Sequence, residues 1–125
     1  ARDAQGNTAT GFTGNVTVAI GTNPGGGTLS GTTTVAAIGG IATFSALSID
    51  KSGIGYTFTA AATGLTGAPS SAFDITPGTA TQLVFAVAPT SSTAGASITP
   101  AVQIIARDAE GNTATGFTGD VTVAI

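Results

Sequence analysis

The side chains best suited to binding a ligand lie in a short motif that occurs twice, as Asp3–Ala4–Gln5–Gly6–Asn7 and as Asp108–Ala109–Glu110–Gly111–Asn112. Aspartate, glutamate and asparagine carry the hard oxygen atoms that Ca²⁺ prefers, and Ca²⁺ takes roughly six to eight of them. The second copy is richer in carboxylates than the first. The calcium candidates are Asp108, Glu110, Asn112 and Asp120.

The same motif also fits a turn that needs no ligand. An aspartate can accept hydrogen bonds from the backbone that follows it, glycine adopts positive φ, and asparagine tolerates the left-handed region. The spacing does not match the twelve-residue calcium loop. We therefore predict a turn and keep a calcium site as the alternative.

The composition argues against catalysis. The 125 residues include no His, Cys, Met or Trp, so the usual zinc, haem and iron–sulfur ligands and the His- or Cys-dependent nucleophilic triads are missing. No pair of carboxylates has the arrangement of an acid–base pair. We predict that the protein is not an enzyme and has no catalytic or cofactor-binding residues.

The charge and hydropathy patterns exclude two further classes of partner. Charged residues make up 7% of the chain, and the basic ones are only Arg2, Lys51 and Arg107. Nucleic-acid binding needs a larger basic surface than three residues can form. No apolar run approaches the roughly 20 residues of a membrane-spanning helix. We expect neither nucleic-acid binding nor membrane insertion.

A long internal identity determines how the chain is organised. Residues 1–20 return as residues 106–125, at an offset of 105, with only two differences, Gln5/Glu110 and Asn15/Asp120. A segment that returns after one domain length is typical of a tandem repeat. The sequence predicts a repeat of about 105 residues, with one full period and a 20-residue overlap.

Apolar residues alternate with polar ones along most of the chain, as Val16, Val18 and Ile20 do. Glycine- and proline-containing turns separate these stretches, and no window keeps a helical period. About seven short strands per period predict an all-β, immunoglobulin-like antiparallel β-sandwich. The expected strands are 15–20, about 32–37, 41–49 with a bulge or bend near Ser45, 55–62, 70–76, 81–88, 101–107 and 120–125.

The repeat is out of phase with the predicted sandwich. Residues 1–80 are expected to carry strands B to G of one immunoglobulin-like repeat without strand A, and residues 81–125 to carry strands A to C of the next. The stretch 77–80 is the expected linker. We expect neither part to be a complete sandwich, so each needs strands from the rest of a longer chain or from a neighbour.

Tyr56, the single tyrosine, lies near the start of the strand expected at 55–62. That position fits a tyrosine corner, in which the hydroxyl bonds to nearby backbone; the alternative is a core aromatic with its hydroxyl at the rim. Asp74, between two apolar residues, should point to solvent. The expected core comprises Val16, Val18, Ile20, Phe44, Leu47, Tyr56, Phe58, Phe73, Phe85, Val102 and Ile104.

Three stretches carry a resemblance to a known family: ARDAxGNTATGFTGxVTVAI, Gly40–Ile41–Ala42–Thr43–Phe44 and Gly55–Tyr56–Thr57–Phe58–Thr59–Ala60. They resemble the bacterial immunoglobulin-like tandem repeats of large extracellular surface, adhesin or fibre proteins, including invasin- and intimin-like repeats. The resemblance covers essentially the whole period. It implies an extracellular, non-enzymatic, array-forming role and supplies no set of ligand-binding residues.

We therefore expect a structural repeat of an extracellular bacterial filament or surface stalk. Its partners would be neighbouring copies, held in a continuous array or, as a less favoured variant, by donation of strands between copies. The alternative is an adhesin repeat that binds a glycan or protein directly, although a chain with one Tyr and no Trp offers few binding aromatics. Surface Thr and Ser could carry O-linked glycans.

Overall fold

The computed structural model describes residues 1–125, and its regular structure consists of β-strands alone. Every ladder between these strands is antiparallel. The predicted all-β class is confirmed, and the several antiparallel sheets are consistent with a β-sandwich. The strands are β1 (Asn15–Ile20), β2 (Leu29–Ser30), β3 (Thr34–Ala36), β4 (Ser48–Ile49), β5 (Gly53–Tyr56), β6 (Phe58–Ala61), β7 (Ala68–Pro69), β8 (Phe73–Ile75), β9 (Gln82–Val87) and β10 (Gln103–Arg107).

The chain divides into two units, Ala1–Thr76 (unit 1) and Pro77–Ile125 (unit 2). The border lies four residues before the one expected from the sequence. Residues 77–80, expected to be a linker, belong to unit 2, where the N–H of Gly78 donates to the carboxylate of Asp108. No helix with the length and apolar character of a membrane span is present.

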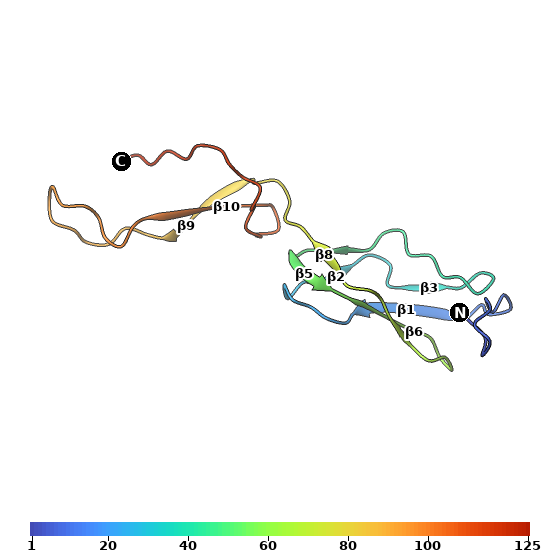
Figure 1. Ribbon diagram of the computed structural model, residues 1–125. Helices are drawn as coiled ribbons and strands as arrows, with labels where there is room; N and C mark the ends of the chain where they lie inside the picture. The colour runs from blue at the N-terminus through green and yellow to red at the C-terminus, as the bar shows by residue number, and fades with distance from the viewer. The chain divides into compact units, whose positions relative to one another are not determined.

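Unit 1 is built on a four-stranded sheet with the order β3-β1-β6-β7, in which β1 and β6 run side by side (Figure 1). The register places Val16 opposite Val35 and Val18 opposite Ala60. Val18 is buried, while Thr17 between them is exposed. The predicted period-two alternation of β1 is confirmed, because one face of the strand meets the interior of the unit and the other meets solvent.

The strand predicted at 55–62 is divided in two, β5 and β6. Gly55, inside β5, has φ of +89°, and the pairing of β5 with β8 shifts register between Gly53 and Tyr56. Thr57 then pairs with the loop that follows β1, accepting from the N–H of Gly21 at 2.8 Å and donating to the carbonyl of Thr22 at 3.2 Å. The two halves therefore join different partners: β5 pairs with β8, and β6 pairs with β1 and β7.

The strand predicted at 41–49 is regular only at its end, in β4, which pairs with β2. Residues 42–45 lie outside every ladder, and the chain bends at Ala46, next to the bend predicted near Ser45. Most of the segment that precedes β4 therefore has no regular structure.

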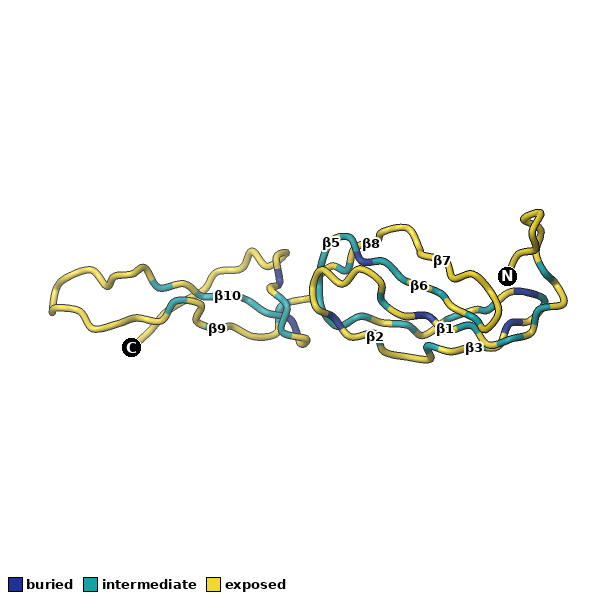
Figure 2. The backbone as a smooth tube through the Cα atoms, turned by 90° about the horizontal axis from the view of Figure 1, so that it is seen from below, coloured by how far each residue is buried: buried dark blue, intermediate teal, exposed yellow.

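The core of unit 1 centres on Tyr56, which is fully buried. Its ring stacks on Phe73 at 6.2 Å between centroids, and Phe73 meets Phe58 at 4.8 Å in a tilted pair. Buried residues form only short stretches of the chain, as the dark blue segments in Figure 2 show. The other core residues predicted in unit 1 are half-buried: Val16, Ile20, Phe44, Leu47, Phe58 and Phe73.

Unit 2 contains one ladder, β9 paired with β10, with Val84 opposite Ile105 and a register shift between Gln103 and Ile104. Residues 88–101 of the loop that joins the two strands are all exposed (Figure 2). Phe85, predicted to be in the core, is 57% exposed, so that prediction is wrong for this structure. Val121–Ala124 line an apolar hollow with Phe85, but they form no strand and leave the ring exposed. Val102 and Ile104 are half-buried.

The strand predicted at 120–125 is absent, although its sequence matches β1 at all but the first residue. Val121 and Val123 are 40% and 64% exposed. A strand exists only as part of a ladder. β1 has β3 and β6 as partners, whereas residues 120–125 pair with no strand of unit 2.

Candidate functional site

The repeated acidic motif folds into what we call the Asp loop, residues 108–112 in unit 2 and residues 3–7 in unit 1. In unit 2 it begins where β10 ends. Oδ1 of Asp108 accepts from the backbone N–H groups of Glu110 at 3.0 Å and Asn112 at 2.8 Å. Oδ2 accepts from Nδ2 of Asn112 at 3.0 Å and from the N–H of Gly78 at 2.8 Å. Because a carboxylate has about four acceptor positions, this one is saturated.

The Asp loop of unit 1 has the same internal hydrogen bonds. Asp3 accepts from the backbone N–H groups of Gln5 at 3.0 Å and Asn7 at 2.8 Å, and from Nδ2 of Asn7 at 3.1 Å. The two copies differ in burial, since Asp3 is exposed and Asp108 is only 3% exposed. In unit 2 the segment that carries Gly78 covers the loop, and Asp3 has no such fourth donor.

Hydrogen bonding sets the charge state of both loops. The side-chain amide of Asn112 lowers the pKa of the Asp108 carboxyl below its ordinary value of 3.8; burial opposes this, and the bonded backbone N–H groups lower the pKa further. The pKa of Asp3 is lowered in the same way, first by the side chain of Asn7 and then by its backbone N–H. Both loops are therefore built around an ionised carboxylate.

The predicted turn is present in both units, and the four calcium candidates occupy different kinds of position. Asp108 and Asn112 meet within the Asp loop, whereas Glu110 and Asp120 are exposed. A cation at Asp108 would have to replace N–H donors that already fill the carboxylate. Nowhere do three His, Cys, Asp or Glu side chains gather in a way that could hold a metal ion. The arrangement suits an anchor between chain segments.

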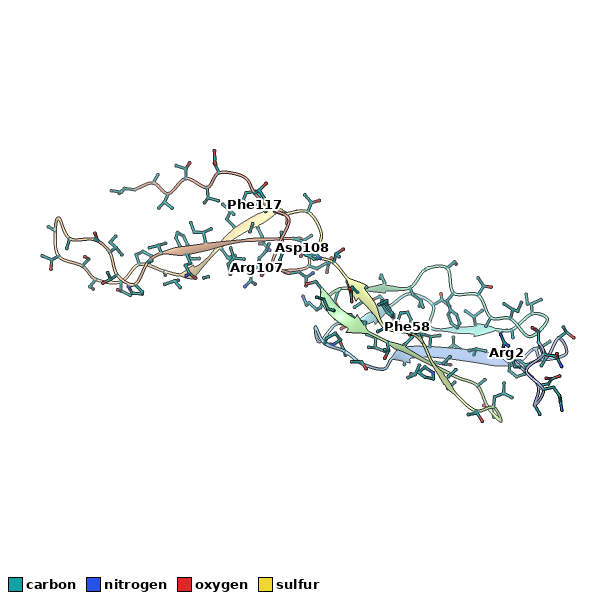
Figure 3. The ribbon with its side chains drawn as sticks, in the orientation of Figure 1. Arg2, Phe58, Arg107, Asp108 and Phe117 are labelled. Carbon is teal, nitrogen blue, oxygen red and sulfur yellow. The ribbon has the colours of Figure 1, made fainter.

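The arginine before each Asp loop also differs between the copies (Figure 3). Nη1 of Arg2 donates to the carbonyl of Gly6 at 3.0 Å. Nε of Arg107 is buried without a hydrogen-bond partner. Local sequences that differ only at Gln5/Glu110 thus acquire different surroundings. In unit 2, residues of the segment 77–82 pack beside Arg107 and Asp108, where Thr81 donates its backbone N–H to the carbonyl of Arg107 at 2.7 Å.

The second organised site is the corner around Tyr56. Its hydroxyl donates to the carbonyl of Lys51 at 2.9 Å, and no part of the side chain is exposed. The hydrogen bond predicted for a tyrosine corner is confirmed, and the alternative of a hydroxyl at the rim is wrong. Asp74 is exposed, as predicted, and its Oδ1 accepts from the N–H of Gly55 at 2.9 Å.

Three glycines surround Tyr56 because nothing larger fits there. A Cβ atom at Gly25 would lie 2.5 Å from the Tyr56 hydroxyl, one at Gly27 would lie 2.9 Å from it, and one at Gly53 would lie 3.0 Å from the ring. The sequence indicated only that these glycines separate strands. The close packing could not be predicted, because residues 25–27 and Tyr56 are far apart in the chain.

No family model, no curated protein and no solved structure matches the chain.

Proposed function

We propose that the chain is a structural repeat of an extracellular bacterial filament or surface stalk, built from immunoglobulin-like sandwiches in tandem. The observation that carries the proposal is the duplication. Residues 1–20 and 106–125 differ at two positions, and the two Asp loops make the same internal hydrogen bonds. Near-identical units that mainly contact their neighbours form extended rods.

Several features support an immunoglobulin-like identity for each repeat. β9 and β10 form an antiparallel pair like strands A and B, and β1 pairs with β6 as strand C pairs with strand F. The hydroxyl of Tyr56 bonds to backbone five residues earlier, at the corner that leads into strand F. The resemblance to bacterial surface and fibre repeats supports the extracellular location.

The sites in the structure favour a mechanical role. The carboxylate of Asp108 accepts a hydrogen bond from the backbone of Gly78, and the hydroxyl of Tyr56 donates one to the backbone of Lys51. Such bonds hold the chain in one conformation, which suits a protein that sets length and resists proteolysis and load. The work of the repeat would be to extend the array and to hold another module away from the cell surface.

The test is the length of chains that carry one, two and four periods of 105 residues. Electron microscopy should show unbranched rods whose contour length increases by an equal step with each added period. Particles that stay globular, or whose length does not follow the number of periods, would overturn the proposal. Antibodies to the chain should label the outside of intact cells that produce the natural protein, and exclusively internal labelling would contradict the location.

A further inference from the structure

The loop between β9 and β10 is long for a β-hairpin. Hairpin strands are commonly joined by roughly two to five residues, and a much longer loop without secondary structure of its own usually has a function. Here β9 ends at Val87 and β10 begins at Gln103, and the residues between them form no strand or helix. Residues 88–101, which we call the Ser/Thr loop, are all exposed (Figure 2). The length of this loop therefore calls for a functional explanation.

The composition of the Ser/Thr loop is that of a segment that carries glycans. Hydroxyl side chains form the run Thr90–Ser91–Ser92–Thr93 and recur at Ser97 and Thr99, and the loop also contains Pro89 and Pro100. The remaining residues are Ala, Gly and Ile, without any charged or aromatic side chain. Segments rich in serine, threonine and proline are typical of O-glycosylated stalks. A loop without charges or aromatic anchors offers little to a protein partner or a small ligand.

The hydroxyl groups in the middle of the run are accessible. The hydroxyl of Thr90 donates to the carbonyl of Thr99 at 3.1 Å, and this bond joins the two sides of the loop. Ser91, Ser92 and Thr93 follow Thr90, are exposed and take no part in that bond. Their backbone belongs to no ladder, so it can adapt to the active site of a modifying enzyme. These three hydroxyls are the best acceptors that the loop offers.

The ladder of unit 2 holds the Ser/Thr loop away from the Asp loop. Gln82 pairs with Arg107 beside the Asp loop, and Val87 pairs with Gln103 at the opposite end, where the Ser/Thr loop begins (Figure 1). The apolar hollow of unit 2 is lined by β9, β10 and residues 121–124, and no residue of the Ser/Thr loop lines it. Sugars on the loop would therefore leave the packing of unit 2 intact.

A loop of this kind is also open to proteolysis. Exposed loops with small and polar residues are preferred sites of cleavage by proteases. The proposed stalk has to resist proteases outside the cell. Charged residues make up only 7% of the chain, so the surface also has few charges to keep it hydrated. A bound glycan is bulky and solubilising, and it would meet both needs.

We propose that the Ser/Thr loop is an O-glycosylation site, with Ser91, Ser92 and Thr93 as acceptors, and that the sugar shields the loop from proteases. In the active site of a glycosyltransferase, the hydroxyl oxygen attacks the anomeric carbon of a sugar carried on a phosphate leaving group. The new carbon–oxygen bond forms as the bond from the anomeric carbon to the phosphate oxygen breaks. The phosphate leaves with the bonding electrons, and the hydroxyl proton passes to a base of the transferase. This inference rests on the proposed extracellular function.

Mass spectrometry of the natural protein, purified from the cells that make it, tests the site. Trypsin cuts after Lys51 and Arg107, so the whole loop falls in one peptide, Ser52–Arg107. That peptide should be heavier than its polypeptide mass by whole monosaccharide units, and electron-transfer fragmentation should place the added mass on residues 91–93. A peptide found only at the polypeptide mass would overturn the proposal, as would sugars confined to other residues.

Two sets of variants, made in the same cells, separate this loop from other exposed hydroxyls. Ser91→Ala, Ser92→Ala and Thr93→Ala together should remove the added mass. Thr63→Ala with Thr66→Ala is the matched control, because both threonines are exposed in the turn between β6 and β7 and lie in the same tryptic peptide. The control should keep the full added mass. If the triple variant keeps that mass, or the control loses it, the assigned acceptors are wrong.

Protection is measured with a broad-specificity protease. The triple variant should be cut within residues 88–101 at least about tenfold faster than the parent chain from the same cells. When both chains are made in a host that adds no sugar, they should be cut at the same rate, because only the sugar distinguishes their protection. Equal rates for the chains from the natural cells would overturn the shielding role.

The two proposals fail in different ways. If the peptide carries no sugar while chains of several periods still form rods that grow in equal steps, the glycosylation site is refuted and the structural repeat stands. Glycosylated particles that stay globular would refute the rod and leave the site in place.

Discussion

The carboxylate of Asp108 accepts a 2.8 Å hydrogen bond from the backbone N–H of Gly78, thirty residues earlier in the chain. This bond joins the start of unit 2 to the loop after β10. Its twin, Asp3, has the same internal loop bonds and is exposed. The two loops, which differ in sequence only at Gln5/Glu110, can therefore be compared directly: Asp108 is bonded to a distant segment and Asp3 is not.

Replacing Asp108 by asparagine should loosen both the loop and the segment before β9. An amide brings its own N–H donors to a position where Gly78 and Asn112 already donate, and it removes the negative charge. Hydrogen exchange measured by NMR should be at least about tenfold faster at Gly78 in Asp108→Asn. Asp3→Asn is the matched control and should leave Gly78 exchange unchanged; equal acceleration by both variants would show that the bond to Gly78 is not the cause.

The Asp loop of unit 2 should open in acid. Because the pKa of Asp108 in the folded chain lies below 3.8, ionisation stabilises the loop at every pH above that value, and the stabilisation is lost as the pH falls below it. The amide signal of Asn112 should stay constant from pH 7 to about 5 and move only below pH 3.8. In Asp108→Asn this transition should vanish. A transition centred above pH 3.8 would contradict the hydrogen-bond pattern.

Removing the hydroxyl of Tyr56 should destabilise unit 1. Tyr56→Phe keeps the ring and its contact with Phe73 but removes the hydrogen bond from the hydroxyl to the carbonyl of Lys51, which should cost about 1 kcal/mol. Urea unfolding followed by circular dichroism should show the loss as a lower midpoint with an unchanged slope. An unchanged midpoint would mean that the hydroxyl bond contributes nothing measurable.

Adding a methyl group beside Tyr56 should be more harmful than adding one on an open loop. In Gly25→Ala the new Cβ would meet the carbonyl oxygen of Ser52 and lie 2.5 Å from the Tyr56 hydroxyl, so we expect a loss of about 1 to 3 kcal/mol. Gly11→Ala is the control, because nothing lies within 4 Å of its Cβ and its φ is not positive. The control should be neutral or more stable by about 0.5 kcal/mol. Similar unfolding midpoints for the two variants would contradict the close packing at Gly25.

Local patterns predicted much of unit 1 correctly. β1 and β8 follow the period-two alternation, because each has one face toward the interior of the unit. The position of Tyr56 near the start of a predicted strand indicated the bond from its hydroxyl to backbone. The acidic motif predicted its turn, because an aspartate and the N–H groups two and four residues later meet without help from the rest of the fold.

Features that depend on distant segments could not be predicted. The bond between Gly78 and Asp108, and the packing of Gly25 against Tyr56, join parts of the chain that no short pattern connects. Phe85 was expected in the core because its strand alternates, but alternation shows only that a strand has an apolar face. Whether that face is covered depends on a second layer of structure.

The sequence by itself determined the strand class, the turns and the duplication, because these depend on neighbouring residues and on identity along the chain. Only the tertiary structure decided which copy of a repeated segment becomes a strand. Residues 16–20 and 121–125 are the same, yet the first lies in β1 between β3 and β6 and the second pairs with nothing. The physical reason is that the hydrogen bonds of a β-strand are made to other strands, so its existence depends on partners that its own residues do not encode.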